Sequence, residues 1–137
     1  MTMNTIPGRI ALVALAVAVP VTASAQASIE GHWRNPKGSV VVRITPCGNL
    51  YCGTVIDASD KAKATARKGG TADLVGATLM TGFKPAGNGA YKGRAFDPKR
   101  GLHGTATIRL VGDNGLEVRG CALMGLLCKT QRWTRVS

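Results

Sequence analysis

The sequence has 137 residues, of which 18 are lysine or arginine and 7 are acidic, so its formal net charge is +11 at pH 7. Hydrophobic residues make up 45% of it, and its 18 glycines show no three-residue period, which excludes intrinsic disorder and a collagen-like chain. The length fits one compact domain, and no internal repeat of fixed period is present.

The first 27 residues have the pattern of a cleavable secretory signal peptide. Arg9 precedes an apolar run at residues 10–19, and small residues permit cleavage after Ala25 or Ala27. The run is shorter than the ~18 apolar residues that indicate a membrane span, and no second apolar segment of that length follows. We therefore expect a mature domain, residues 28–137, that is periplasmic or secreted and has no transmembrane span. Its charge is +10, because Arg9 leaves with the signal peptide.

Period-two alternation of apolar and polar residues predicts half-buried β-strands along the mature chain. Val40, Val42 and Ile44 form one such set, and Asn114-Gly115 is a strong hairpin signal between two others. The predicted strands span residues 29–35, 39–46, 50–57, 74–83, 89–96, 102–111, 115–122 and 128–136.

Eight short strands joined by tight turns favour an all-β fold, a small up-and-down antiparallel barrel, because closure removes exposed strand edges. Residues 58–73 are the exception to the strand pattern, since Lys61, Lys63, Arg67 and Lys68 are interspersed with alanines there. We interpret this segment as a solvated loop, with one helical turn or a mobile lid as the alternatives.

Four cysteines, Cys47, Cys52, Cys121 and Cys128, lie in the mature chain. An even number in an exported protein indicates disulfides, and neither their spacing nor the position of the two histidines fits a metal site. In an up-and-down order the first pair and the second pair lie at opposite ends of the barrel, whereas a disulfide needs Cα atoms within ~7 Å. We therefore predict two local disulfides, Cys47–Cys52 and Cys121–Cys128, each pinning one hairpin.

Motifs in the first and last predicted strands resemble those of lipocalin-like, or calycin, barrels. These barrels begin with Gly-x-Trp and place a basic residue on the last strand over that tryptophan; this chain has Gly31-His32-Trp33 and Trp133-Thr134-Arg135. A cation over an indole face contributes ~0.5–2 kcal/mol. The resemblance implies that Trp33 and Arg135 close one end of the barrel.

A narrower set of motifs covers nearly the whole mature chain and resembles an exported bacterial family known as domain of unknown function 2147. The resemblance implies a lipocalin-like fold and no established activity. The motifs are Gly31-x-Trp33, Cys47-Gly48-x-x-x-Cys52-Gly53, Leu74-Val75-Gly76, Gly93-x-x-x-Asp97-Pro98, and Arg119-Gly120-Cys121 through Gln131-x-Trp133-x-Arg135-Val136.

An eight-stranded barrel is either filled by its own side chains or just wide enough for one small ligand. Both interiors are compatible with the pattern. If a pocket exists, the candidate ligand-binding residues are the larger apolar and aromatic ones. By strand alternation, two of them, Tyr91 and Phe96, do not both point inward. The candidates are Trp33, Leu79, Phe83, Tyr91 and Phe96.

No catalytic, metal or cofactor site is predicted. The seven acidic residues form no evident acid–base pair, and Asp97-Pro98 is typical of a turn. We expect a non-enzymatic protein that binds a small apolar ligand. The alternative is docking on an anionic envelope component, lipid or polysaccharide, through cations such as Lys61, Lys63, Arg67 and Lys68. Scattered cations and few aromatic residues argue against a nucleic-acid partner.

Overall fold

The computed structural model describes residues 3, 7–20 and 28–137. Residues 7–20 contain no helix or strand. The predicted cleavage sites after Ala25 and Ala27 lie outside the described residues. Within the described ranges, no helix has the length and apolar composition needed to cross a bilayer.

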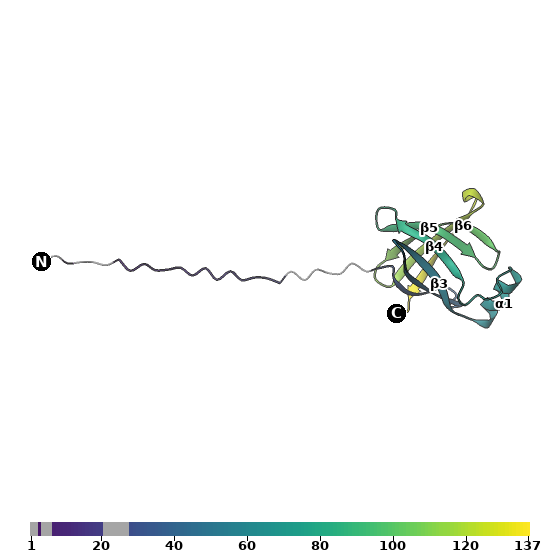
Figure 1. Cartoon of the computed structure of the whole chain (residues 1–137), viewed down its shortest axis with the longest axis horizontal. Coiled ribbons are helices and arrows are strands. Elements are labelled where there is room, and N and C mark those ends of the chain that lie inside the picture. The colour runs from purple at the N-terminus through teal and green to yellow at the C-terminus, as the bar shows by residue number, and fades with distance from the viewer. Residues whose placement is uncertain (1–2, 4–6, 21–27) are drawn as a thin grey trace.

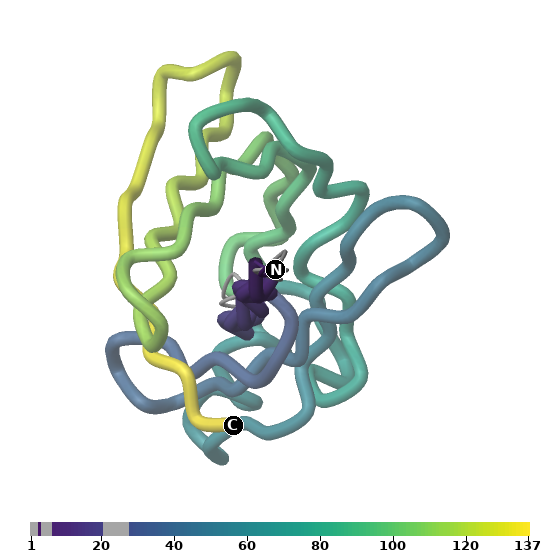
Figure 2. The backbone as a smooth tube through the Cα atoms, turned by 90° about the vertical axis from the view of Figure 1, so that its left-hand side faces the viewer, coloured from purple at the N-terminus to yellow at the C-terminus, as the bar shows by residue number. Residues whose placement is uncertain are grey.

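Eight antiparallel strands form a closed barrel in which each strand pairs with its neighbours in sequence and the last pairs with the first. The tube in Figure 2 accordingly runs around a ring. The predicted all-β, up-and-down barrel is confirmed. The strands are β1 (Gly31–Arg34), β2 (Val40–Cys47), β3 (Leu50–Ala58), β4 (Thr78–Pro85), β5 (Ala90–Asp97), β6 (Leu102–Val111), β7 (Gly115–Ala122) and β8 (Leu127–Arg135).

The predicted solvated loop between the third and fourth strands is wrong, because a helix, α1 (Asp60–Lys68), forms there. The Ser59 hydroxyl accepts a hydrogen bond from the Ala62 amide at 3.1 Å and so caps the first turn. Alanine and lysine favour helix, and Ala66 on the inner side of α1 is buried. These local preferences and the buried contact of Ala66 favour a helix over a solvated loop.

Strand β4 begins at Thr78, four residues later than predicted. Residues 74–77 form a turn instead, in which the Ala77 amide donates to the Leu74 carbonyl at 3.0 Å. The Gly76 amide donates to the Val55 carbonyl of β3 at 2.8 Å. The apolar side chain of Leu74 is therefore buried although Leu74 lies in a turn and not in a strand.

The up-and-down order divides the connections between two ends of the barrel. We call the end that carries residues 35–39, 59–77, 98–101 and 123–126 the open end, and the opposite end the closed end. In Figure 1 the helix α1 lies at the open end, away from the point where the N-terminal segment meets the barrel.

Both predicted disulfides are confirmed. Cys47–Cys52 joins β2 to β3 at the closed end, with its Cα atoms 5.8 Å apart. Cys121–Cys128 joins β7 to β8 at the open end, with its Cα atoms 4.1 Å apart.

The inward faces of the strands fill the half of the barrel nearer the closed end. Trp33, Phe83, Ile108 and Leu116 are fully buried there and belong to one continuous apolar cluster. No polar or charged residue of the described chain is buried with them. The same cluster extends to Leu79 nearer the open end, where the side chains leave a cavity unfilled.

Candidate functional site

Arg135, predicted with Trp33 to close the barrel, lies at the closed end. Its guanidinium carbon lies 4.3 Å from the ring centroid of Trp33, and its three nitrogens donate to backbone carbonyls of Ser28 at 2.6 Å, Glu30 at 2.7 Å and Asp113 at 2.8 Å. The Trp33 indole N–H donates to the Ile29 carbonyl at 2.8 Å. Every side-chain nitrogen of the pair thus has a backbone partner.

The glycine two residues before Trp33 is required by the same contact. Gly31 has φ +134°, and a Cβ placed on it would lie 2.6 Å from Nη1 of Arg135 and 2.9 Å from the Ser137 carbonyl. A side chain at this position would be strained and would displace the guanidinium. The requirement for glycine two residues before Trp33 therefore has a steric cause.

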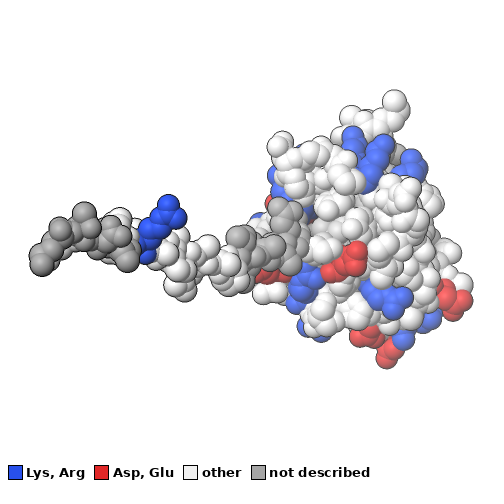
Figure 3. Space-filling model, turned by 60° about the vertical axis from the view of Figure 1, so that its left-hand side comes forward, with Lys and Arg blue, Asp and Glu red and all other residues white. Residues whose placement is uncertain are grey.

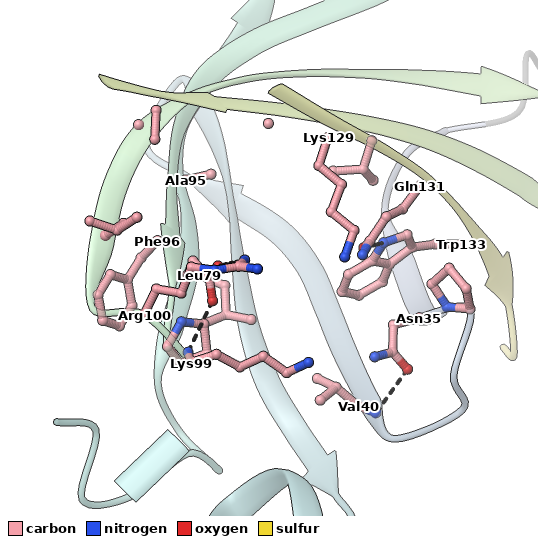
Figure 4. Close-up of a pocket in the computed structure, with 18 of the residues that line it drawn as sticks. Asn35, Val40, Leu79, Ala95, Phe96, Lys99, Arg100, Lys129, Gln131 and Trp133 are labelled. Atoms are coloured by element: carbon pink, nitrogen blue, oxygen red, sulfur yellow. Dashed lines mark hydrogen bonds and ion pairs between the residues drawn. The ribbon is translucent and has the colours of Figure 1, made fainter. Parts of the chain in front are cut away.

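A cavity of about 630 Å³ occupies the open end. Small-molecule sites are typically ~300–1,000 Å³, so the cavity has the size of such a site. Its walls come from the connection between β1 and β2, from α1, from the connection between β5 and β6, and from the parts of β7 and β8 nearer the open end (Figure 4).

The deeper wall of the cavity is apolar. Leu74, Leu79 and Trp133 line it and are themselves more than nine-tenths buried. The Trp133 indole N–H donates to the Gln131 amide oxygen at 3.0 Å, so the ring presents its carbon face without leaving an unpaired donor. Val118 of β7 completes this side.

The rim of the cavity is cationic. Lys37, Lys99, Arg100 and Lys129 line it, and Asp97 is the one carboxylate among the lining residues. Asp97 forms an ion pair with Arg100 at 2.9 Å and accepts the Lys99 amide at 3.0 Å. As predicted for Asp97-Pro98, this carboxylate stabilises a turn.

Lys99 has an unfavourable charge environment. Repulsion from Lys37 lowers the pKa of Lys99, and desolvation and repulsion from Lys129 add to the effect. Asp97 acts in the opposite direction but does not cancel it. The rim therefore holds like charges close together.

The five predicted ligand-binding residues do not meet at one site. Leu79 and Phe96 line the cavity, and Phe96 stacks on His103 with ring centroids 4.6 Å apart. Trp33 and Phe83 are fully buried in the core and do not line the cavity.

The fifth candidate, Tyr91, lies below the cavity and packs edge-on against Tyr51, with ring centroids 5.6 Å apart. Tyr91 is half-buried beside the core cluster and does not line the cavity. Burial, followed by the negative charge of Glu30, raises the pKa of Tyr51. This aromatic pair therefore belongs to the filled half of the barrel.

Sequence reasoning missed the residues that form most of the polar lining. Lys129, Gln131 and Trp133 share one face of β8 by the period of two, and Figure 4 shows all three side chains directed at the cavity. That period was a usable signal. Lys37 and Lys99 lie in turns, where no periodicity indicates direction.

The four cations predicted as an anion-binding surface all belong to α1. Lys61, Lys63, Arg67 and Lys68 do not line the cavity, whereas Ala62 and Ala66 of the same helix do. On the face seen in Figure 3, lysines and arginines are spread among acidic and uncharged residues and do not gather in one patch.

The residues at the cavity do not include a metal-binding arrangement. Across residues 3, 7–20 and 28–137, no group of three or more His, Cys, Asp or Glu side chains is placed to hold a metal ion. The four cysteines are all in disulfides. What the site offers is an apolar wall, hydrogen-bonding amides and ammonium groups.

Comparison with known proteins identifies the family and the fold. The model of a family described as "Uncharacterized protein conserved in bacteria (DUF2147)" matches residues 31–135. Protein HP1028 from Helicobacter pylori, described as belonging to the lipocalin family, has a similar structure, with a TM-score of 0.64 and 17% sequence identity over 81% of this chain and 84% of that chain. A search of curated proteins found no match.

Proposed function

The chain belongs to the DUF2147 family of uncharacterized bacterial proteins, and on that premise we propose that it is a non-enzymatic binding protein that holds one small, largely apolar ligand in the open end of its barrel. The description of the family names no ligand, so the proposal rests on the cavity.

One observation supports this proposal most directly, and it is the division of the barrel interior. The half near the closed end is filled by fully buried side chains such as Trp33 and Phe83, whereas about 630 Å³ at the open end is left to solvent. Exposed apolar walls are unfavourable in water at ~25 cal/mol per Å². A ligand that covers Val40 and Val118, which line the cavity and are only half-buried, recovers this free energy.

We further propose that the protein acts in the periplasm or outside the cell, after removal of residues 1–27. The signal-peptide pattern around Arg9 and the small residues before Ala27 supports export. Two disulfides and membership of a bacterial family are consistent with it.

The test is binding of a neutral apolar probe, phenylnaphthylamine, whose fluorescence rises in an apolar site. We expect saturable binding by the parent protein and a loss of about tenfold or more in affinity, ~1.4 kcal/mol, for Ala95→Phe, which places a ring in the cavity. Thr81→Phe is the matched control, because Thr81 is exposed on β4 and does not line the cavity. Absence of probe binding by the parent, or equal loss in both variants, would contradict the proposal.

A second candidate function is docking on an anionic lipid surface. The observation that favours it is the apolar tip between β7 and β8, where Leu123 is 60% and Leu126 is 89% exposed and Met124 is fully exposed. This tip lies at the same end as Lys129 and α1. Exposed apolar residues beside cations are typical of surfaces that contact membranes.

A further inference from the structure

We propose that the ligand of the open-end cavity is a single-chain amphiphile with an anionic head group, a carboxylate or a phosphate, and that Lys37, Lys99 and Lys129 bind this head group. We call these residues the three-lysine site. The inference rests on the proposed function, because it assumes that the cavity takes an apolar chain.

The three lysines converge from parts of the chain far apart in sequence. Lys37 lies between β1 and β2, Lys99 between β5 and β6, and Lys129 on β8. All three line the same cavity, and Figure 4 shows the side chains of Lys99 and Lys129 extending into it from different sides. The fold itself thus places three ammonium groups at one rim.

Nearby acidic groups do not neutralise these lysines. The other cations at the cavity have partners, since Arg100 pairs with Asp97 at 2.9 Å and Arg132 lies 3.8 Å from Glu117. Within the described part of the chain, none of the three lysines forms an ion pair. Their mutual repulsion, which lowers the pKa of Lys99, is relieved by an anion placed among them.

The apolar wall fixes the direction of the ligand. Leu79 and Trp133 lie on the inner side of the cavity, and the lysines lie at its rim. A head group at the rim therefore points its chain toward the core. A cavity of about 630 Å³ suits one chain and excludes a large multi-chain lipid from full enclosure.

Binding through charge at the rim and docking through charge on the exterior predict different contacts with the protein. The four cations of α1 do not line the cavity, so a polymer docked on them would not need the three-lysine site. An amphiphile inside the cavity would contact the three-lysine site and leave the four cations of α1 untouched. Substitutions at the two places therefore separate the two modes.

The experiment compares dodecanoate, dodecyl phosphate and dodecanol by isothermal titration, with acetate as a competitor that has a head group and no chain. The variant is Lys37→Gln, Lys99→Gln and Lys129→Gln together. The matched control, Lys68→Gln, Lys84→Gln and Lys92→Gln, removes the same charge from exposed positions that do not line the cavity.

We expect dodecanoate or dodecyl phosphate to bind the parent protein about tenfold more tightly than dodecanol at low ionic strength, a difference of ~1.4 kcal/mol. The preference should disappear in the three-lysine variant, persist in the control, and resist equimolar acetate. The ratio between the two anions then identifies the head group, carboxylate or phosphate.

Equal affinity of the parent for dodecanol and both anions would overturn the three-lysine site and leave the proposed function standing. An equal loss of preference in the control variant would also overturn it, because general charge would then explain the effect. Failure of the parent to bind any of the chains, dodecanol included, would instead contradict the proposed function.

Discussion

The guanidinium of Arg135 joins three separate parts of the chain at the closed end of the barrel. It lies over the Trp33 ring and donates to carbonyls before β1 and between β6 and β7. A planar group with several donors in a fixed fork can do this, whereas a lysine ammonium cannot reach all three carbonyls from one position.

We therefore predict that Arg135→Lys lowers the free energy of unfolding by ~1.5–3 kcal/mol, the usual range for hydrogen bonds made by a charged group. Urea denaturation followed by tryptophan fluorescence measures it. Arg109→Lys is the control, since Arg109 is exposed on β6, and it should change stability by less than ~0.5 kcal/mol. Equal stability of parent and Arg135→Lys would show that stability does not depend on the fork.

Unlike Arg135, Lys99 carries a charge that is unfavourable in the folded protein. Its pKa is lowered by Lys37 and Lys129, so the unfolded chain binds the proton more tightly than the folded one. Well below the lowered pKa both states are protonated and the full cost is present. As pH rises from the lowered pKa toward the ordinary 10.5, the folded state loses its proton first and stability rises.

We predict from this sign that Lys99→Gln, without ligand at pH 7, is as stable as the parent or more stable, by less than ~1 kcal/mol because the group is near the surface. The advantage should shrink as pH approaches 10.5. Urea midpoints of both proteins across this range provide the measurement. A parent that is the more stable at pH 7 would show that Lys99 has a favourable partner.

At the scale of elements, the positions of the strands could be predicted from the sequence, whereas the residues that line the barrel interior were harder to predict. Period-two sets such as Val40, Val42 and Ile44 depend on one face meeting the core, and this requirement is written into each strand separately. The pairing of β1 with β8 followed from closure, which Trp33 and Arg135 indicated.

The helix α1 was predicted only as an alternative, one helical turn, because its burial is so slight. Ala66 is its one buried residue, and alanine spacing gives a weak amphipathic signal beside four cations. The capping serine at position 59, with Asp60 in the first turn, was the stronger indication of a helix start. A short helix on a rim is defined by its caps more than by its apolar face.

The candidate site was predictable only where a strand sets the direction of a side chain. Leu79 lies on a strand, and it lines the cavity. Lys129 and Gln131 were within reach of the same reasoning. Lys37 and Lys99 were not, because both lie in turns, where no period of two indicates the direction of a side chain.

At the scale of the whole molecule, the proposed function and the second candidate both use the open end but respond differently to salt. Binding of a neutral apolar probe inside the cavity depends on apolar contact, which salt does not screen. Docking of α1 cations on anionic vesicles depends on Coulomb attraction, which fades beyond ~8 Å at physiological ionic strength. Insertion of the apolar tip at Leu123, Met124 and Leu126 would resist salt as well.

We predict that phenylnaphthylamine binding persists at high salt, whereas retention on phosphatidylglycerol vesicles is weak and is lost there. Replacing Lys61, Lys63, Arg67 and Lys68 together by Gln should weaken vesicle retention and leave probe binding unchanged, because none of these side chains lines the cavity. Flotation and probe fluorescence on the same samples measure both.

Docking on lipid through the apolar tip would give the opposite result. If strong vesicle retention survives high salt and is abolished by Leu123→Ser, Met124→Ser and Leu126→Ser together, while the parent takes up no probe, lipid docking becomes the function that the open end supports. Cys121–Cys128 pins the base of this tip, and the three residues are exposed, so their replacement should leave the barrel intact. The salt response and the tip variant therefore separate cavity binding, surface charge and insertion in one set of measurements.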